Sequence, residues 1–203
     1  MADTAADQTL LTAAGRDNAD GVTAALDAGA AIDARDNHGQ TALLFAVQHG
    51  NLRLARDLIG RGADINAQAL NQDTPWLLAG ALGRTEILAA MLETGKVDYT
   101  IRNRYGGNAL IPACERGHVD TVRLLLERSK IDVNHINNLG WTALLEAVIL
   151  SDGGARHIEI VRMLLAAGAG PDVADKDGAS PLQHARDRRY DALAALIRDA
   201  GGR

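Results

Sequence analysis

The sequence predicts an all-α solenoid of six stacked helix-turn-helix repeats, and two observations predict it. The first is a phrase of one small polar residue followed by an apolar run, which returns along the chain with lead residues Thr41, Thr74, Asn108, Thr142 and Ser180. Its steps of 33, 34, 34 and 38 residues are typical of stacked supersecondary units. The second is a chain that is 47% hydrophobic but 3% aromatic, which suits closely packed thin helices of Ala, Leu, Ile and Val.

Each element can be justified within one repeat, residues 36–67. Residues 36–40 carry turn chemistry, and Thr41 is a good N-cap for the apolar helix that follows. Gly50 ends that helix, and a second amphipathic helix runs from there to Gly62. Helices shorter than about 12 to 15 residues are marginal alone. The neighbouring repeats must therefore supply the stability.

The pattern D-x-x-G-x-T-A-L, A-x-x-x-G and L-L-x-x-G-A-D-I-N resembles the ankyrin repeat, and the resemblance covers roughly residues 8–201. It implies a β-turn and two antiparallel helices per unit, with β-hairpin-like loops joining the units. It also implies recruitment of partner proteins through the hairpin tips and the neighbouring first-helix surface, which form the concave side. The fourth and fifth units look like stand-alone bacterial ankyrin proteins.

We expect one ankyrin-repeat domain over residues 1–203, with capping repeats at both ends. Its units are approximately 8–34, 35–67, 68–101, 102–135, 136–173 and 174–201. The first unit lacks the turn and the T-P-L-H-like start, and it has Asp17 where the middle units have glycine. The last unit has Arg189 at that position, among charged residues that suit an uncovered end.

Three departures from the repeat stand out. Ala69 and Gln72 replace the Asp and Gly of the third turn, so we expect a looser hairpin there. Pro112 lies in the first turn of the fourth unit's first helix, where its missing amide costs the bond back to Asn108. The fifth unit gains five residues in LSDGGARH, 150–157, which we interpret as a longer loop between its helices. The alternative to a functional insertion is a harmless one.

The aromatic residues divide into two groups. Phe45 and Trp76 fall inside first helices and are expected in the core, whereas Tyr105 and Trp141 fall at successive hairpin tips. Exposed Trp and Tyr beside Arg are typical of interface hot spots. The alternative is that each ring packs on the neighbouring hairpin. The predicted partner-binding residues are His38, Arg104, Tyr105, Glu115, Arg116, Leu139 and Trp141.

No motif of a known catalytic or metal site occurs, so we expect a non-catalytic binding scaffold with no cofactor, metal or catalytic residue. His118 and His157 follow the end of a first helix in matching phrases and are expected to be structural, and Cys114 is expected to be buried. An alternative function is a small-molecule or ion-binding regulatory module near the 152–157 insertion, using Glu146, Asp152 and His157.

The net charge of −5 and the pI near 5.6 argue against nucleic-acid and anionic-membrane partners, since both need a basic face. Arg186, Arg188 and Arg189 are interleaved with acidic residues, which indicates a solvated face. No window is apolar enough for a membrane span, and the start of the chain does not resemble a signal peptide. We expect a monomer that binds a protein partner in the cytoplasm, or in the periplasm or outside the cell if a signal peptide has been removed.

Overall fold

The computed structural model describes residues 4–203 and contains helices and loops, with no strand in that range. The helices are α1 (Ala5–Gly15), α2 (Ala19–Asp27), α3 (Ala42–His49), α4 (Leu52–Gly60), α5 (Pro75–Ala81), α6 (Thr85–Glu93), α7 (Leu110–Glu115), α8 (Val119–Arg128), α9 (Ala143–Ile149), α10 (Ala155–Ala166), α11 (Pro181–Asp187) and α12 (Asp191–Asp199). They form six consecutive pairs, which confirms the predicted all-α repeat architecture.

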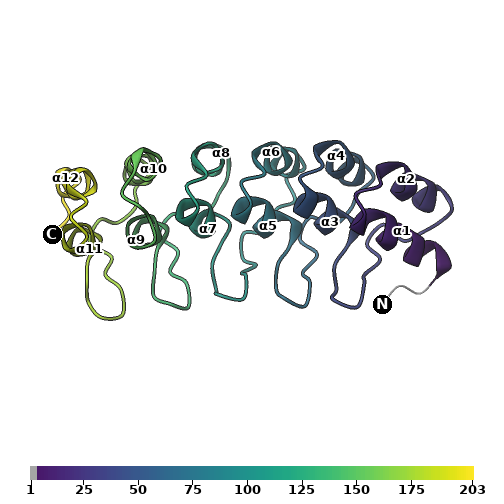
Figure 1. The fold of residues 1–203 in the computed structure, drawn as a ribbon, viewed down its shortest axis with the longest axis horizontal. Coiled ribbons are helices and arrows are strands. Elements are labelled where there is room, and N and C mark those ends of the chain that lie inside the picture. The colour runs from purple at the N-terminus through teal and green to yellow at the C-terminus, as the bar shows by residue number, and fades with distance from the viewer. Residues whose placement is uncertain (1–3) are drawn as a thin grey trace. The chain divides into compact units, whose positions relative to one another are not determined.

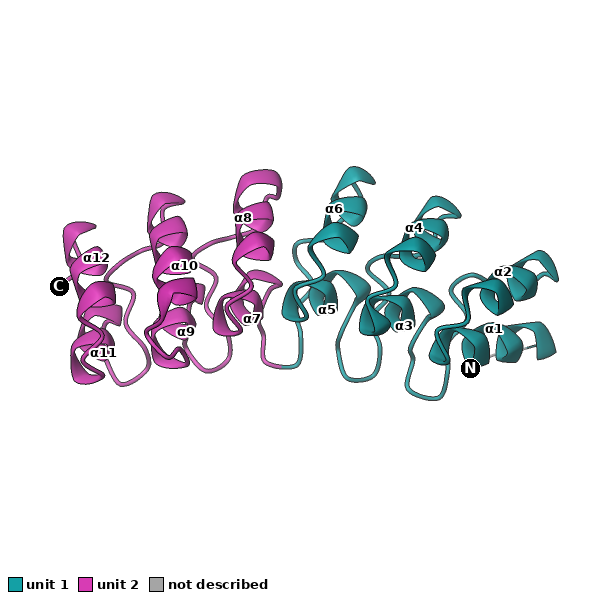
Figure 2. Cartoon of the chain, turned by 45° about the horizontal axis from the view of Figure 1, so that its top comes forward, with its two compact units in different colours: residues 1–104 teal, residues 105–203 magenta. Residues whose placement is uncertain are grey.

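The described chain divides into two compact units, residues 4–104 and residues 105–203, each with three helix pairs (Figure 2). Within each unit the odd-numbered helices form one row and the even-numbered helices a second row, while the connecting hairpins extend from the odd-numbered side (Figure 1). The single domain over 1–203 stays a prediction, and its first three residues lie outside the described residues.

The lead residues of the repeated phrase cap the first helices as expected. The hydroxyl oxygens of Thr41, Thr74 and Thr142 accept hydrogen bonds of 3.3, 3.1 and 3.2 Å from the amide three residues later. All three threonines are buried, so water cannot replace the bond. Each cap therefore places buried leucine at the same point of these three repeats.

Helix α7 departs from this pattern because of Pro112. It begins two residues after its lead residue, Asn108, whereas α3, α5, α9 and α11 begin one residue after theirs. Proline has no amide hydrogen to donate to the carbonyl four residues earlier. Asn108 still serves this end of the helix, since its Oδ1 accepts from the amides of Leu110 and Ile111 at 3.1 and 3.3 Å. The expected loss of the Pro112 hydrogen bond is thus accommodated by a short first helix, which has six residues.

Three non-glycine residues in the described chain have a positive φ, and all three replace a repeat glycine. Asp17 and Arg189 stand where the middle repeats have a glycine after the first helix, with φ of 56° and 58°. Gln72 replaces the turn glycine at φ 66°. This left-handed conformation costs other residues about 1 kcal/mol or more relative to glycine. The chain keeps the repeat's backbone at these positions despite the loss of glycine.

The third hairpin also keeps its geometry. The amide of Ala69 donates to the Asp73 carbonyl at 2.9 Å, and the amide of Gln72 donates to the Ala69 carbonyl at 2.9 Å. The second hairpin forms the same pair of backbone bonds. The hairpin therefore shows no looser backbone pairing, and the Oδ1 of Asn71, which accepts from the Asp73 amide at 3.0 Å, partly replaces the missing aspartate.

The aromatic prediction for the first unit is half right. Trp76 is buried and meets Tyr99 edge to face, with ring centroids 5.9 Å apart. Phe45 is only partly buried, so its assignment to the core was wrong. It is the fourth residue after the lead Thr41, and its ring lies beside Gly15 at the end of α1 in the neighbouring repeat. In the fifth and sixth repeats polar side chains occupy the same position.

Candidate functional site

Two neighbouring segments of the second unit carry the exposed apolar side chains that the site prediction requires. They are residues 105–108, which end one hairpin, and residues 136–142, which form the next. Tyr105 is 52% exposed and Leu139 50%, which confirms their predicted place on the surface. Trp141 is half-buried, so the expectation that its ring is exposed was only partly right. Ile136, which the sequence reasoning missed, is 50% exposed.

Two hydrogen bonds hold these hairpins to each other. The amide of Asn138 donates to the Tyr105 carbonyl at 2.8 Å. The Nε2 of His135 lies 2.6 Å from the Gly106 carbonyl oxygen, so this nitrogen carries the proton and donates. The exposed apolar side chains thus stand on a backbone that is fixed before any partner arrives, which lowers the entropy cost of binding.

The other predicted residues of the second unit lie at the end of α7. Glu115 is half-buried in the last turn, and Arg116 is exposed at the C-cap. The carbonyl oxygen of Glu115 lies 3.1 Å from the Nε2 of His157, which ties α7 to α10. The structure therefore brings Tyr105, Glu115, Arg116, Leu139 and Trp141 into one compact unit on neighbouring repeats.

His38 and Arg104 belong to the first unit, and both are exposed. His38 is at the tip of the second hairpin, where its carbonyl accepts the Leu70 amide at 2.9 Å. Leu70 is 77% exposed and was also missed, because a single leucine in a polar turn carries no periodic signal. The first unit thus repeats the tip-to-tip bond of the second with a smaller apolar surface.

Glu146 forms a buried polar contact behind the fifth hairpin. It is 5% exposed, and its Oε1 accepts a 2.8 Å hydrogen bond from the Nδ2 of Asn137. Burial raises the pKa of Glu146 to about 7, the charge of Glu115 adds to this rise, and the bond from Asn137 opposes it. The sequence analysis considered Glu146 for a ligand site near the 152–157 insertion, whereas in the structure its carboxyl is buried and bonded to Asn137.

The inserted segment is shared between a loop and a longer helix. Helix α10 begins at Ala155, inside the insertion, and has 12 residues, so the expectation that the segment only lengthens a loop was wrong. Gly153 has a φ of 69°, and a Cβ there would lie 2.6 Å from the Tyr190 ring, whose hydroxyl donates to the Ser151 carbonyl at 2.8 Å. The loop is therefore packed against the last repeat.

His118 and His157 are not equivalent, contrary to the matching phrases. His118 is the N-cap of α8, whereas His157 lies inside α10 and is buried. The Nδ1 of His157 is 3.4 Å from the Oδ1 of Asp152, but the angles are not those of a hydrogen bond, and this nitrogen has no other partner. Within residues 4–203 no group of three or more His, Cys, Asp or Glu side chains is arranged to hold a metal ion.

The remaining candidates for chemistry are accounted for by packing. Cys114 is buried as predicted, and desolvation, with a further contribution from Glu146, raises the pKa of its thiol well above the usual range. His49 bonds to the Gly15 carbonyl at 3.1 Å, and the Nε2 of His184 lies 2.6 Å from the Oδ2 of Asp175. No helix of residues 4–203 is both long and apolar enough to cross a membrane.

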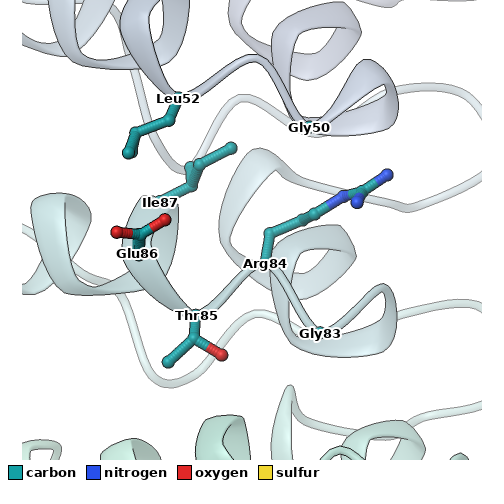
Figure 3. A pocket seen from close by; sticks show the side chains of 7 residues that line it. All are labelled: Gly50, Leu52, Gly83, Arg84, Thr85, Glu86 and Ile87. Atoms are coloured by element: carbon teal, nitrogen blue, oxygen red, sulfur yellow. The ribbon is translucent and has the colours of Figure 1, made fainter.

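A cleft of about 270 Å³ lies in the first unit beside Gly50 and Arg84 (Figure 3). The Arg84 guanidinium donates to the carbonyls of Val47 and Gln48 at the end of α3, at 3.3 and 3.0 Å. A Cβ on Gly50 would lie 2.7 Å from its Cζ, so glycine is required for this approach. The Arg84 side chain thus joins two repeats, and these hydrogen bonds are made to the protein backbone rather than to a ligand.

These repeats match the family model for ankyrin repeats, in three copies over residues 2–69, 45–137 and 76–175, and the chain belongs to this family. It is 39% identical to the ankyrin repeat protein YahD of Escherichia coli (strain K12) over 94% of both chains. A crystal structure of an ankyrin repeat domain from Acinetobacter baumannii AYE is 49% identical, with a TM-score of 0.90 over 96% of this chain and 98% of that one. A second ankyrin repeat structure, EF0377, is 41% identical, with a TM-score of 0.91 over 95% and 97%.

Proposed function

We propose that this protein is a non-catalytic adaptor that binds a partner protein through the hairpin tips and first helices of residues 105–142. Ankyrin repeats are generally protein-protein interaction modules. The observation that carries the proposal for this chain is the pair of adjacent hairpins with exposed Tyr105, Ile136 and Leu139 and half-buried Trp141. Large apolar side chains grouped on a fixed backbone favour a protein interface.

Glu115 and Arg116 supply charged groups beside this apolar surface, at the end of α7. Interfaces commonly place an apolar centre within a polar rim, and the rim charges favour one partner over others. We propose that His38 and Arg104 also contact the partner from the first unit. The proposed state is a monomer in the cytoplasm, with neither nucleic acid nor membrane as partner, and light scattering tests the monomer.

The test is affinity capture from a lysate of the source organism, with the wild type compared with the Tyr105→Ala/Trp141→Ala double variant. We expect the variant to recover at least ten times less of each specific partner than the wild type does, because aromatic anchors contribute about 2 kcal/mol or more each. Its melting temperature should stay within a few degrees of the wild type, since neither ring is fully buried.

Leu126→Ala is the matched control. Leu126 is a half-buried apolar residue of the same unit, but it lies on α8, in the row of second helices, away from the hairpin tips. This variant should capture the partner at the wild-type level. Equal capture by the double variant and the wild type would contradict the assignment of the surface.

A further inference from the structure

Asn137 connects the buried Glu146 to the hairpin that carries Leu139 and Trp141. The Oδ1 of Asn137 accepts hydrogen bonds from the amides of Leu139 and Trp141 at 2.9 and 3.0 Å. The backbone amide of Asn137 donates to the Trp141 carbonyl at 3.0 Å. The Nδ2 of the same side chain donates to the Oε1 of Glu146 at 2.8 Å. One buried side chain therefore holds both ends of the turn and is itself held by a carboxyl group.

The equivalent position is filled differently in the repeats that share this hairpin. In the second repeat Asp36 accepts from the amides of His38 and Gln40, both at 2.8 Å, and the helix residue equivalent to Glu146 is Phe45. In the sixth repeat the residue behind the turn is His184, which pairs with Asp175. The fifth repeat is thus the one in which the acid sits on the helix and the neutral amide on the hairpin.

Few charges surround Glu146. From α7 the carboxylate of Glu115 acts on it, and the Cys114 thiol on the same helix is neutral because its pKa is raised. On α10 the one buried titratable group is His157, which bonds to the main chain of Glu115. On α11 the least exposed titratable group is His184, which is half-buried and engaged by Asp175. Among residues 4–203 no ion pair joins Glu146 to a cationic side chain, so proton uptake is the available route to neutrality.

We propose that proton exchange at Glu146 controls how firmly Asn137 holds the hairpin 137–141, and thereby the presentation of Leu139 and Trp141. An amide N–H bonds more strongly to a carboxylate than to a neutral acid. The ionised Glu146 therefore fixes the Asn137 side chain, and with it the amides of Leu139 and Trp141 that donate to this side chain. Protonation of Glu146 loosens these bonds. The effect on partner binding rests on the proposed function, since the hairpin carries the proposed docking residues. The effect of the proton on the hairpin itself requires no partner.

The test is amide hydrogen exchange by NMR on the full chain at pH 6 and pH 8, corrected for intrinsic exchange. We expect the amides of Leu139 and Trp141 to exchange about fivefold faster at pH 6, and their chemical shifts to titrate near pH 7. Global stability should change in the opposite direction, because removal of the buried charge favours the folded state. If the contact between Asn137 and Glu146 were merely structural, the local amide protection and the global stability would change in the same direction with pH.

Three variants and one internal reference make the experiment decisive. Glu146→Gln keeps an acceptor for Asn137 without a titrating proton, so both amides should become independent of pH. Glu115→Gln removes the neighbouring charge and should shift the midpoint below that of the wild type. Asp191→Asn removes an exposed carboxylate at the start of α12 in the same unit, leaves Asn137 and Glu146 unchanged, and should leave the midpoint unchanged. The amide of Thr100 serves as the reference, with no titration near pH 7, because it donates at 2.8 Å to the carboxylate of Asp98, whose pKa is lowered by the Thr100 hydroxyl and by that bond.

Wild-type amides of Leu139 and Trp141 that do not titrate would overturn the proposal, as would an unchanged titration in Glu146→Gln. If Glu146→Gln does not fold, an unchanged midpoint in Glu115→Gln would overturn it. Loss of partner capture by the Tyr105→Ala/Trp141→Ala variant is a separate result. A normal titration together with unaffected capture would contradict the docking surface alone.

Discussion

The second and fifth repeats are built on the same hairpin, yet they differ in the side chain at one position of the helix that follows it. Both turns close with the same two backbone hydrogen bonds, and both use a side-chain oxygen to accept two amides of the turn. Four residues after the lead threonine the second repeat has the half-buried ring of Phe45, whereas the fifth has the buried carboxyl of Glu146, which accepts from its hairpin. The comparison teaches that the repeat specifies the backbone and leaves this one position free to acquire a chemical role.

The largest expected effect tests what the two repeats share. Leu44 and Leu145 are each three residues after the lead threonine and fully buried. Leu44→Ala and Leu145→Ala should each lower the free energy of unfolding by about 4 kcal/mol, through lost burial and the cavity left behind. Urea denaturation monitored by circular dichroism measures both. A difference of more than about 2 kcal/mol between them would show that the cores are not equivalent.

The next effect tests where the repeats differ. Glu146 has a raised pKa of about 7, so the folded state binds a proton that the unfolded state releases above pH 4.5. Its contribution to stability is therefore complete below pH 4.5 and is lost as the pH rises to 7. Relative to wild type, Glu146→Gln should gain up to about 3 kcal/mol between pH 5 and pH 8.

Phe45→Leu in the second repeat is the control for that measurement, because it changes the equivalent position without a titrating group. Its difference from wild type should be the same at both pH values. Urea titrations at pH 5 and pH 8 provide the comparison. A pH-independent difference for Glu146→Gln would mean that the carboxyl is not strained by burial in the folded protein.

The smallest expected effect concerns the third hairpin, which lacks the repeat glycine. Gln72 has a φ of 66°, where the second and fifth hairpins have Gly39 and Gly140. Gln72→Gly should raise the melting temperature by several degrees, since relief of the left-handed strain gives about 1 kcal/mol. Calorimetry measures it, and a lower melting temperature would show that the glutamine stabilises the turn by other contacts.

Much of the fold could be predicted because its signals are local. The threonine caps, the terminal glycines and the apolar spacing recur in each copy, and aligning the copies identified the positions where Asp17, Gln72 and Arg189 replace glycine. The start of α10 was missed because residues 150–157 contain two glycines and a turn signal. The helix begins there since Tyr190 and Gly153 pack the loop closely enough for Gly154 to act as its N-cap.

The sequence by itself determined the repeat, its six helix pairs and the exposure of Tyr105 and Leu139 at the hairpin tips, because period, capping and turn residues act over a few neighbours. Only the tertiary structure decided that Asn137 joins Glu146 to the hairpin and that His157 turns toward Glu115. These contacts link residues 9 and 42 positions apart. Burial and charge act through space, so no local pattern in the chain carries them.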